Sequence, residues 1–341
     1  MSLLVGKIVL DIDAGAPNNG RGLDNVGKVK ALRVGRDVHP YVSAQAFRRW
    51  LRDTIAAAEP ASPVTRSGSG AKQQAYTGGR PDQFLDDDLF GYMVALKGAN
   101  TQRDTVLATG TLVSVTPQRP DSDFGTMSRG FPAEANPVLH EHEHYTADLA
   151  GDLLLDLPRV GVFETDGSGL KVNLVGAAIK EAIAAGADET SFRGNLALRM
   201  PIAERRRRVG VLFRALSGLR GGAKQSAHYG DRTPALIVLA PMKGGVNPFT
   251  RSVAARDGRT YFDTAALREE MSAWSDELDG PVMIGWAPGF LGDQRSNATE
   301  DLAHLIAAGR VSIMHPRTML LDLAGRVESG QHDGWFEDPQ R

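Results

Sequence analysis

The chain has 341 residues, a formal net charge of −2 and no cysteine. Without cysteine it can form no disulfide, no thiol nucleophile and no cysteine-based zinc site, and this composition fits the reducing cytoplasm where we expect the protein. The sequence has no run of about 18 apolar residues, so we expect no membrane-spanning segment, and the apolar run after Met1 is too short for a signal peptide.

The first third of the chain alternates between ordered elements and loops rich in glycine and proline. Alternating apolar residues predict a strand over 3–12, and the Gly/Asn/Pro-rich segment 13–25 predicts a loop. A helix is predicted over 43–58, with Ser43 as its N-cap. Segment 60–82 is rich in proline, glycine and serine and is predicted to be a mobile surface segment; a short helix is expected over 84–93.

Further along, residues 104–115 and 138–149 are predicted as two strands of a long antiparallel hairpin with an irregular tip. Residues 153–163 predict a further strand region, broken at Pro158. The remaining predicted elements are helices over 174–185 and 203–219, a buried strand over 235–241, a helix over 265–278, a strand over 281–288 and a helix over 298–309.

The order of these elements predicts an α+β fold with a β-α-β-β-α-β, ferredoxin-like core. Its strands would be 3–12, 138–149, 153–163 and 235–241, and its helices 43–58 and 203–219. No internal repeat is visible.

Charge is unevenly distributed. Residues 193–232 contain ten lysines and arginines against two acids, whereas residues 134–168 contain eight acids against one arginine. The first region would attract phosphates and the second would repel them, unless both are simply solvated faces. The four arginines at 205–208 cover all sides of a helix turn, so we expect some of them to face partners or solvent.

The predicted helix over 43–58 has two stripes. Its apolar stripe is Phe47, Trp50, Leu51 and Ile55. Its polar stripe is Gln45, Arg48, Arg49 and Arg52, a spacing that suits successive phosphates, because these arginines would repel one another without anions. An ordinary solvated basic face is the alternative.

The stretch SGLRGGAKQSAHYG, residues 217–230, is the second candidate for phosphate binding. Gly221 and Gly222 permit positive φ and the convergence of backbone amides, and Lys224 adds charge. Gln225, Ser226 and His228 add hydrogen-bonding groups. Ala223 separates Gly222 from Lys224, so this is not a Walker motif, and the phosphate could belong to a nucleotide, a cofactor or a nucleic acid.

Two clusters could hold a metal. On a strand, His140, His142 and His144 face one way and could bind zinc, while Glu141 and Glu143 face the other way; the alternative is a polar face of the hairpin. The acids at 86–88 could collect a divalent cation, although such runs are usually solvated or N-capping. We assign no metal site and no cofactor, and nothing else in the sequence argues for catalysis.

Several stretches together resemble the backbone subunit of type I-B CRISPR Cascade complexes, the DevR-type autoregulator family. They are AGAPNNGRG (14–22), PYVSAQAFRRWLR (40–52), DDDLFGYM (86–93), EHEHY (141–145), RVGVF (159–163) and LSGLRGGAKQSAHYGDRTPALIVLAPMKGG (216–245). They run in order along most of the chain, and the last is long enough to be specific. The extra proline in the first stretch is a departure, and 60–82 matches nothing in the family.

The resemblance implies a single hand-shaped subunit: an RRM-like or ferredoxin-like palm from 1–58 and 139–341, a finger-like insertion at 59–104 and a thumb hairpin at 105–146. Copies would line up head to tail along one guide RNA (crRNA), beside other Cascade subunits, and present it to a target DNA strand. No membrane is implied, and the family's type I members do not cut the target.

Carried over to this sequence, the guide-RNA contacts fall on residues of the palm helix, the glycine stretch and the first loop: Ser43, Gln45, Arg48, Arg49, Arg52, Gly221, Gly222, Lys224, Gln225, His228, Asn18, Asn19, Arg21 and Lys28. The thumb would separate bases with an apolar wedge, for which Phe124, Met127 and Phe131 are the candidates. Two alternatives stay open: a metal-dependent ribonuclease that uses the histidine strand, and a stand-alone RNA-binding regulator.

Overall fold

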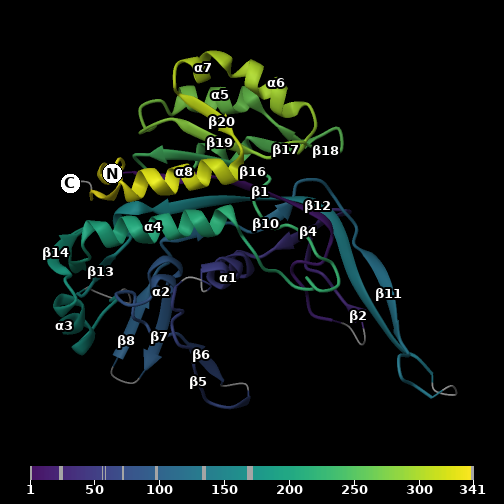
Figure 1. Ribbon diagram of the computed structural model, residues 1–341, viewed down its shortest axis with the longest axis horizontal. Coiled ribbons are helices and arrows are strands. Elements are labelled where there is room, and N and C mark those ends of the chain that lie inside the picture. The colour runs from purple at the N-terminus through teal and green to yellow at the C-terminus, as the bar shows by residue number, and fades with distance from the viewer. Residues whose placement is uncertain are drawn as a thin grey trace.

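The computed structural model describes residues 2–22, 26–55, 57, 59–70, 73–96, 99–132, 136–166 and 172–338. The chain forms a mixed α+β structure around an eleven-stranded sheet (Figure 1). This agrees with the predicted α+β class. No helix of the described residues has both the length and the apolar character needed to cross a membrane.

The centre of the sheet is β1 (Leu3–Gly15), which pairs antiparallel with β12 (Val138–Asp156) and β16 (Leu236–Met242). The strand order is β20 (Val311–Met314), β19 (Val282–Trp286), β16, β1, β12, β10 (Leu112–Ser114), β4 (Asp37–Val42), β3 (Ala31–Val34). Three further strands pair with β12: β2 (Val26–Gly27), β9 (Leu107–Thr109) and β11 (Asp121–Met127).

Helices cover both faces of this sheet, which explains why β1 is apolar almost throughout its first ten residues. Leu4, Ile8 and Leu10 pack in one core with α1 (Ala44–Ile55), α4 (Ile202–Ser217) and α8 (Pro316–Glu328). Val5 and Val9, on the opposite face, pack in a second core with α5 (Thr264–Ala273), α6 (Gln294–Asp301) and α7 (Ala303–Ala307). Figure 1 shows α1 and α4 on one side of the sheet and α5 to α7 on the other.

The predicted strand 138–149 and residues 153–156 of the predicted strand 153–163 belong to one strand, β12, so the prediction of two separate core strands is wrong here. Residues 162–164 form a short strand of their own. β12 runs through Gly151 and Asp152, which pair with Ile8 and Lys7 of β1. The chain turns only afterwards, in the 3₁₀ turn Leu157–Arg159 that contains Pro158. Cross-strand pairing along both edges of β12 therefore overrides the local break in apolar character.

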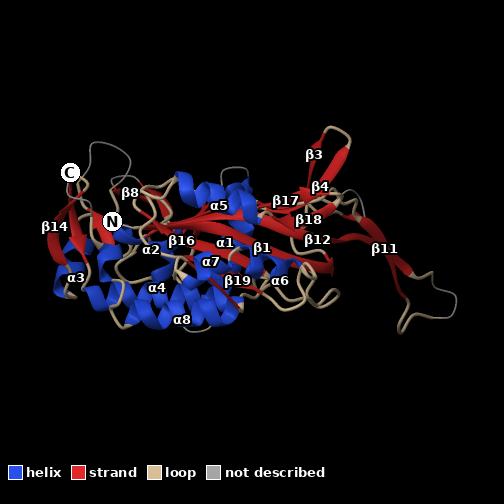
Figure 2. Cartoon of the chain, turned by 90° about the horizontal axis from the view of Figure 1, so that it is seen from above, coloured by secondary structure: helices blue, strands red, loops and turns tan. Residues whose placement is uncertain are grey.

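A hairpin projects from the body. β11 pairs antiparallel with residues 138–144 of β12, and Figure 2 shows this arm extending beyond the helices. The predicted strand 104–115 is instead two short strands, β9 and β10, which pair with the other end of β12 and are separated at Gly110. The arm thus has β11 and β12 as its strands.

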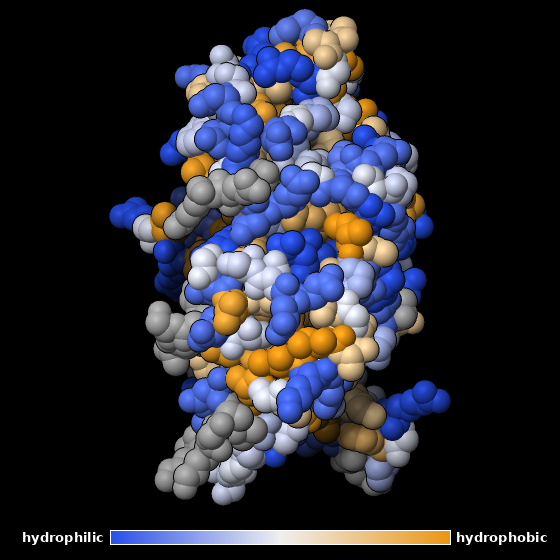
Figure 3. Space-filling view, turned by 90° about the vertical axis from the view of Figure 1, so that its left-hand side faces the viewer, coloured by the Kyte–Doolittle hydropathy of each residue, from blue (hydrophilic) through white to orange (hydrophobic). Residues whose placement is uncertain are grey.

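Smaller elements complete the described structure. They are α2 (Leu85–Phe90), α3 (Ala177–Ala184), β5 (Thr65–Ser67), β6 (Gln74–Tyr76), β7 (Tyr92–Leu96), β8 (Ala99–Arg103), β13 (Val162–Glu164), β14 (Asp188–Phe192), β15 (Asn195–Arg199), β17 (Val253–Arg256), β18 (Arg259–Phe262) and the 3₁₀ turns Pro248–Arg251 and Asp333–Phe336. The end of the molecule that carries α3 and β13 to β15 presents apolar side chains among hydrophilic ones (Figure 3), and Ile183 and Leu196 are exposed in these elements.

The acidic run of α2 is buried, which corrects the prediction of a solvated or cation-collecting cluster. Asp88 is fully buried and contacts the guanidinium groups of Arg103 and Arg208 as well as the amide of Gly161. Asp87 accepts hydrogen bonds from the hydroxyl of Ser62 at 2.7 Å. The run is therefore a structural node that joins four distant segments.

The arginine run of α4 is likewise structural instead of partner-facing. Arg205 and Arg208 are buried, and Arg205 donates to the backbone carbonyls of Val160 and Pro158. The other two arginines of the run form ion pairs: Arg206 with Asp333, and Arg207 with Glu204 and Glu59. Much of the positive charge predicted to attract phosphates is thus compensated inside the fold.

Candidate nucleic-acid interface

The glycine stretch 217–230 lies directly on the indole of Trp50 in α1. Gly221 has φ +128° and Gly222 has φ +93°, both in the region that favours glycine. A Cβ on Gly221 would lie 2.9 Å from Trp50 Cγ. The amide of Ala223 donates to the carbonyl of Pro17 at 2.9 Å. The glycines are therefore required for close packing, whatever the stretch binds.

The side chain of Gln225 braces this loop from inside. Its Nε2 donates to the carbonyl of Gly221 at 2.7 Å, and its Oε1 accepts from the amide of Gly230 at 3.3 Å. Lys224, by contrast, is exposed and has φ +59°. The brace holds the lysine at the surface of the turn.

The arginines of α1 lie in three different environments. Arg49 is exposed and forms two hydrogen bonds with Asp53, at 2.8 and 2.9 Å, which raises the pKa of its guanidinium. Arg48 donates to Thr109 Oγ1 at 3.1 Å. Arg52 lies 4.8 Å above the ring of Phe90, and burial lowers its pKa. Asp53, one turn from Arg49, thus supplies a negative charge beside this stripe.

The amino-terminal end of α1 agrees with the prediction. The hydroxyl of Ser43 accepts from the amide of Ala46 at 3.4 Å, and Gln45 is exposed. The predicted buried stripe is also confirmed, since all four of its members are at most 4% exposed: Phe47, Trp50, Leu51 and Ile55.

The first loop contributes two kinds of residue. Asn18 is buried and its amide donates to the carbonyl of Tyr41 at 3.4 Å, which is a structural contact. Lys28 lies 3.4 Å from a carboxylate oxygen of Glu143. Asn19 and Arg21 are exposed.

These three segments converge on one surface. Trp50 and Pro17 both contact the glycine stretch, and the amide of Arg220 donates to Thr54 Oγ1 at 3.0 Å. The three segments that carry the sequence-predicted RNA contacts thus pack against one another through Trp50, Pro17 and Thr54.

Two residues of this surface escaped the sequence analysis. Tyr229 is 89% exposed at the end of the glycine stretch, and an exposed aromatic ring beside basic residues is a platform for base stacking. Arg232 is buried beneath Gly222 and Gly230, and its Nε and Nη2 have no hydrogen-bond partner among the described residues. Tyr229 could have been predicted, because it is an aromatic residue within a basic stretch of the sequence. The burial of Arg232 could not be predicted from the sequence.

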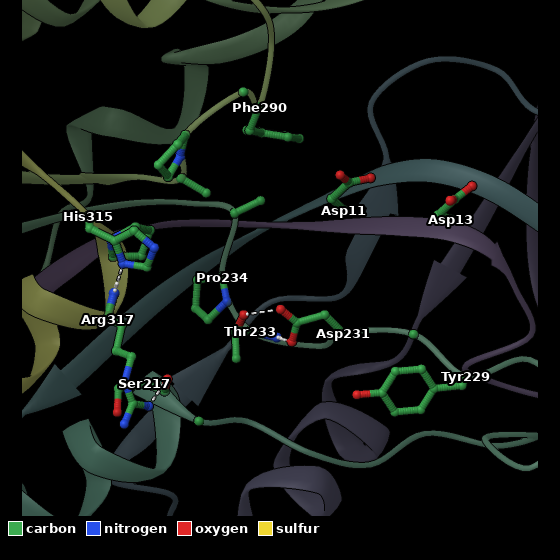
Figure 4. Close-up of a pocket in the computed structure, with 17 residues that line it drawn as sticks. Asp11, Asp13, Ser217, Tyr229, Asp231, Thr233, Pro234, Phe290, His315 and Arg317 are labelled. Atoms are coloured by element: carbon green, nitrogen blue, oxygen red, sulfur yellow. Dashed lines mark hydrogen bonds between the residues drawn. The ribbon is translucent and has the colours of Figure 1, made fainter.

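A cleft of about 730 Å³ borders the stretch on its other side (Figure 4). Asp11 and Asp13 of β1 line one wall, and His315 and Arg317 line another. Burial, and then the charge of Asp148, raises the pKa of Asp11. Tyr229 of the glycine stretch also lines this cleft, whose acidic wall would repel phosphate.

The histidines of β12 face the glycine stretch. His142 is buried, and its Nε2 lies 2.6 Å from Nε2 of His228 and 3.4 Å from a carboxylate oxygen of Asp123. Burial, followed by the charge of Lys224, lowers the pKa of His142. Glu143 faces away, as predicted, and accepts from the amide of Val29 at 2.9 Å.

The three wedge candidates are exposed on the arm, at 66% for Phe124, 57% for Met127 and 37% for Phe131. Val138 and Leu139, which the sequence analysis did not single out, are exposed beside them. Their role as a wedge stays a prediction.

The chain is similar to a curated protein and to chains of solved structures. No protein-family model matches the chain. The protein named CRISPR-associated protein Cas7/Cst2/DevR of Myxococcus xanthus (strain DK1622) is 31% identical over 163 aligned residues, which cover 42% of this chain and 54% of the relative. This chain therefore spans about half the length of that relative.

The solved structures share the fold at low identity. A chain of a CRISPR RNA-guided surveillance complex, pre-nicking, matches with a TM-score of 0.60 and 12% identity, over 95% of this chain and 100% of that chain. A chain of a second CRISPR RNA-guided surveillance complex matches with a TM-score of 0.54 and 14% identity, over 95% and 98%. The curated relative bears out the resemblance to a DevR-type protein, and the solved structures show a shared fold.

Proposed function

We propose that this chain is a non-catalytic backbone subunit of a Cascade-type CRISPR effector that binds the guide RNA. The observation that carries the proposal is the convergence of α1, the first loop and the glycine stretch on one surface. It occurs in a chain whose fold matches chains of RNA-guided surveillance complexes over 95% of its length.

The proposed binding is to the RNA backbone. Arg48, Arg49 and Lys224 offer charge to phosphates, Tyr229 offers a ring for stacking, and the buried charge of Arg232 adds positive potential below the loop. A subunit that carries many different guides has to bind without reading bases, and backbone contacts satisfy that requirement. Gln225 and Asn18 hydrogen-bond to backbone carbonyls, so we assign them the role of holding the loops in position and no direct contact with RNA.

The proposal extends to assembly. Residues 1–58 and 139–341 form the palm, 59–104 the finger-like insertion and 105–146 the thumb, whose arm reaches a neighbouring copy and the guide–target duplex. Copies stack head to tail on one crRNA, with other Cascade subunits at the ends, and expose the guide for pairing with the target DNA strand. A head-to-tail contact does not close, so the RNA sets the length of the array.

Co-expression with a guide array, followed by purification and sequencing of bound RNA, tests the proposal. We expect guide RNA of defined length and a multimer that salt dissociates. The matched control is the Arg48→Glu, Arg49→Glu double variant, which should purify as a folded monomer without RNA. Recovery of the wild-type chain without RNA, or with random cellular RNA, would contradict the proposal.

The same preparation separates the two alternatives. A metal-dependent ribonuclease would shorten the bound RNA when Mn²⁺ or Zn²⁺ is added, and a chelator would stop it. A stand-alone regulator would appear as a monomer or dimer on one particular target.

A further inference from the structure

Three metal-ligating side chains from three separate segments meet where the arm leaves the body. Asp123 comes from β11, His142 from β12 and His228 from the glycine stretch, and one ligand atom from each lies within 4.8 Å of the others. Asp123 and His142 are register partners across the hairpin, whereas His228 is 86 residues away from His142 in the sequence.

The facing nitrogens of the two imidazoles can share one proton in a hydrogen bond or can together hold a cation. The two Nε2 atoms are 2.6 Å apart, and Nδ1 of His142 is buried with no hydrogen-bond partner among the described residues. If both rings carry their proton on Nδ1, both Nε2 lone pairs point at the same place, which is the arrangement of two imidazole ligands. The carboxylate of Asp123, 3.4 Å from His142 Nε2, supplies a third donor.

The spacing suits a small cation after a slight opening. Ligands of a tetrahedral Zn²⁺ at about 2.0–2.1 Å lie about 3.3 Å from one another. The distances to His142 Nε2 are 2.6 and 3.4 Å, and the three ligand atoms lie within 4.8 Å of one another. The His142–His228 pair therefore has to open by less than an ångström, and Asp123 and His228 have to move closer together. Asp123 is exposed and His228 half-buried, on a hairpin and a loop that can make this adjustment.

We propose that Asp123, His142 and His228 bind one divalent cation of the zinc class. Water fills the fourth position. Two imidazole nitrogens and one carboxylate select zinc, cobalt or nickel over magnesium and calcium, which prefer all-oxygen sites. The cation ties the arm to the glycine stretch, so its role is structural and goes beyond the proposed binding of guide RNA.

One nearby charge opposes the cation. Lys224 lies one turn before His228, whose amide donates to the carbonyl of Lys224 at 2.7 Å, and the positive charge of this lysine would repel Zn²⁺. The Asp123 carboxylate offsets that repulsion. Removal of the lysine should therefore strengthen metal binding, whereas removal of a ligand should weaken it.

The test is a zinc titration of the purified full chain, without any affinity tag of histidines, after dialysis against a chelator. We expect one Zn²⁺ per chain by elemental analysis and calorimetry. His228→Gln and Asp123→Asn, both outside the core, should each weaken binding by at least roughly tenfold. Lys224→Ala should tighten it.

His140→Gln is the matched control. His140 lies on the same face of the same strand, with its ring 6.3 Å from that of His142, but outside the ligand cluster, so its loss should leave affinity unchanged. In the wild type, Zn²⁺ should slow hydrogen exchange in residues 217–230, and His228→Gln should abolish that protection.

Three results would overturn the proposal. The first is wild-type affinity in His228→Gln. The second is equal loss in His140→Gln, which would place the cation on the histidine strand alone. The third is zinc-dependent RNA cleavage that His228→Gln removes, which would make the role catalytic. None of these depends on whether the chain is a Cascade subunit, so failure here leaves the proposed function standing.

Discussion

Gly221 occupies a position where a side chain is excluded twice, by its φ of +128° and by the indole of Trp50. We expect Gly221→Ala to destabilise the folded chain by about 1–3 kcal/mol, measured by urea unfolding, because the backbone strain and the contact both have to be relieved. RNA binding should fall with it. Lys224→Ala serves as the comparison, since it should leave the unfolding midpoint unchanged.

Substitution of Gly222 tests the contribution of loop shape to RNA binding separately from the contribution of charge. Its Cβ would lie 3.3 Å from Arg232 Nε and from the carbonyl of Pro17, at a φ of +93°. Gly222→Val should therefore weaken RNA binding more than Lys224→Ala, which removes one charge and lowers the slope of affinity against salt by about one. Equal and small effects of both variants on filter-binding affinity would show that the stretch is only a loop after a helix.

Asp148 and Asp11 are register partners on adjacent strands, and burial is the largest cause that raises the pKa of each. A raised carboxyl pKa means that the folded chain holds the proton more tightly. The stabilisation is present below the ordinary carboxyl pKa near 4 and is lost as pH rises through the folded value.

Asp148→Asn should consequently raise the thermal unfolding midpoint at pH 7, and the gain should vanish at about pH 4 and below. Asp152→Asn, on the same strand, is the control with the opposite sign, because Asp152 pairs with Lys7 at 2.9 Å. A gain for Asp148→Asn that is independent of pH would contradict the account of Asp11 and Asp148 as repelling partners.

Sequence periodicity predicted the burial of single residues correctly where that burial depends on one face of a helix. The buried stripe of α1 and the cap at Ser43 are confirmed. The Arg49–Asp53 pair was readable at i,i+4 and was missed. The burial of Asp88 with Arg103 and Arg208 was not readable, since those partners lie 15 and 120 residues away.

At the scale of elements, α1 presents Arg48 and Arg49 while Arg52 packs on Phe90. We expect Arg48→Glu with Arg49→Glu to abolish RNA-dependent assembly and to leave the monomer folded, as seen by circular dichroism and size-exclusion chromatography. Lys180→Glu with Arg268→Glu makes the same change in net charge on exposed positions of α3 and α5 and should assemble normally. Unchanged assembly and salt slope in the α1 variant would move the RNA surface elsewhere.

The arm presents its two strand-borne wedge candidates on opposite faces. Register places Phe124 opposite Glu141, and Met127 opposite Val138, so strand alternation puts Met127 on the histidine face and Phe124 on the other. Only one of them can enter a given base step, where insertion costs a few kcal/mol of unstacking.

A mismatch scan along the guide should show positions at regular intervals where mismatches cost nothing. One of Phe124→Ala and Met127→Ala, but not the other, should weaken target binding strongly. Phe131→Ala, at the turn, completes the set. Uniform penalties along the guide would exclude a wedge of any of the three.

The local sequence pattern predicted most of the helices. It failed for strands whose extent depends on pairing with a neighbouring strand. β12 is one strand because β1 pairs with it through Gly151 and Asp152, where its own sequence reads as a break. The helix α8 was missed, although Met319, Leu320, Leu323, Ala324 and Val327 form a helical apolar face. The metal cluster needed His228 brought to the hairpin, which no spacing in the sequence reveals.

For the whole molecule, the segment with ten basic residues against two acids is far less basic in space than in sequence. Ion pairs bind Arg206, Arg207, Arg208 and Arg214 to acids within the chain. Within this segment, the exposed cations Arg220 and Lys224 of the glycine stretch remain as candidates for phosphate contacts.

Assembly should follow from RNA length. We expect the number of subunits on each guide to rise in proportion to the length of its spacer, as counted by native mass spectrometry, because each copy covers a fixed stretch of backbone. Moderate salt should remove subunits together with the RNA contacts. A constant number of copies on short and long spacers would rule out a polymer whose length the RNA sets.

The continuity of β12 has a mechanical consequence. Its 19 residues pass without interruption from the centre of the sheet into the arm, so the arm is a beam clamped at one end by neighbouring strands on both sides. Deflection of such a beam is greatest at its tip and smallest at its root. Contact at His142 and His228 adds a support beyond the root and shortens the span that can bend. In the proposed array, the tip could then follow small differences in pitch between successive copies, while the root keeps its orientation on the sheet.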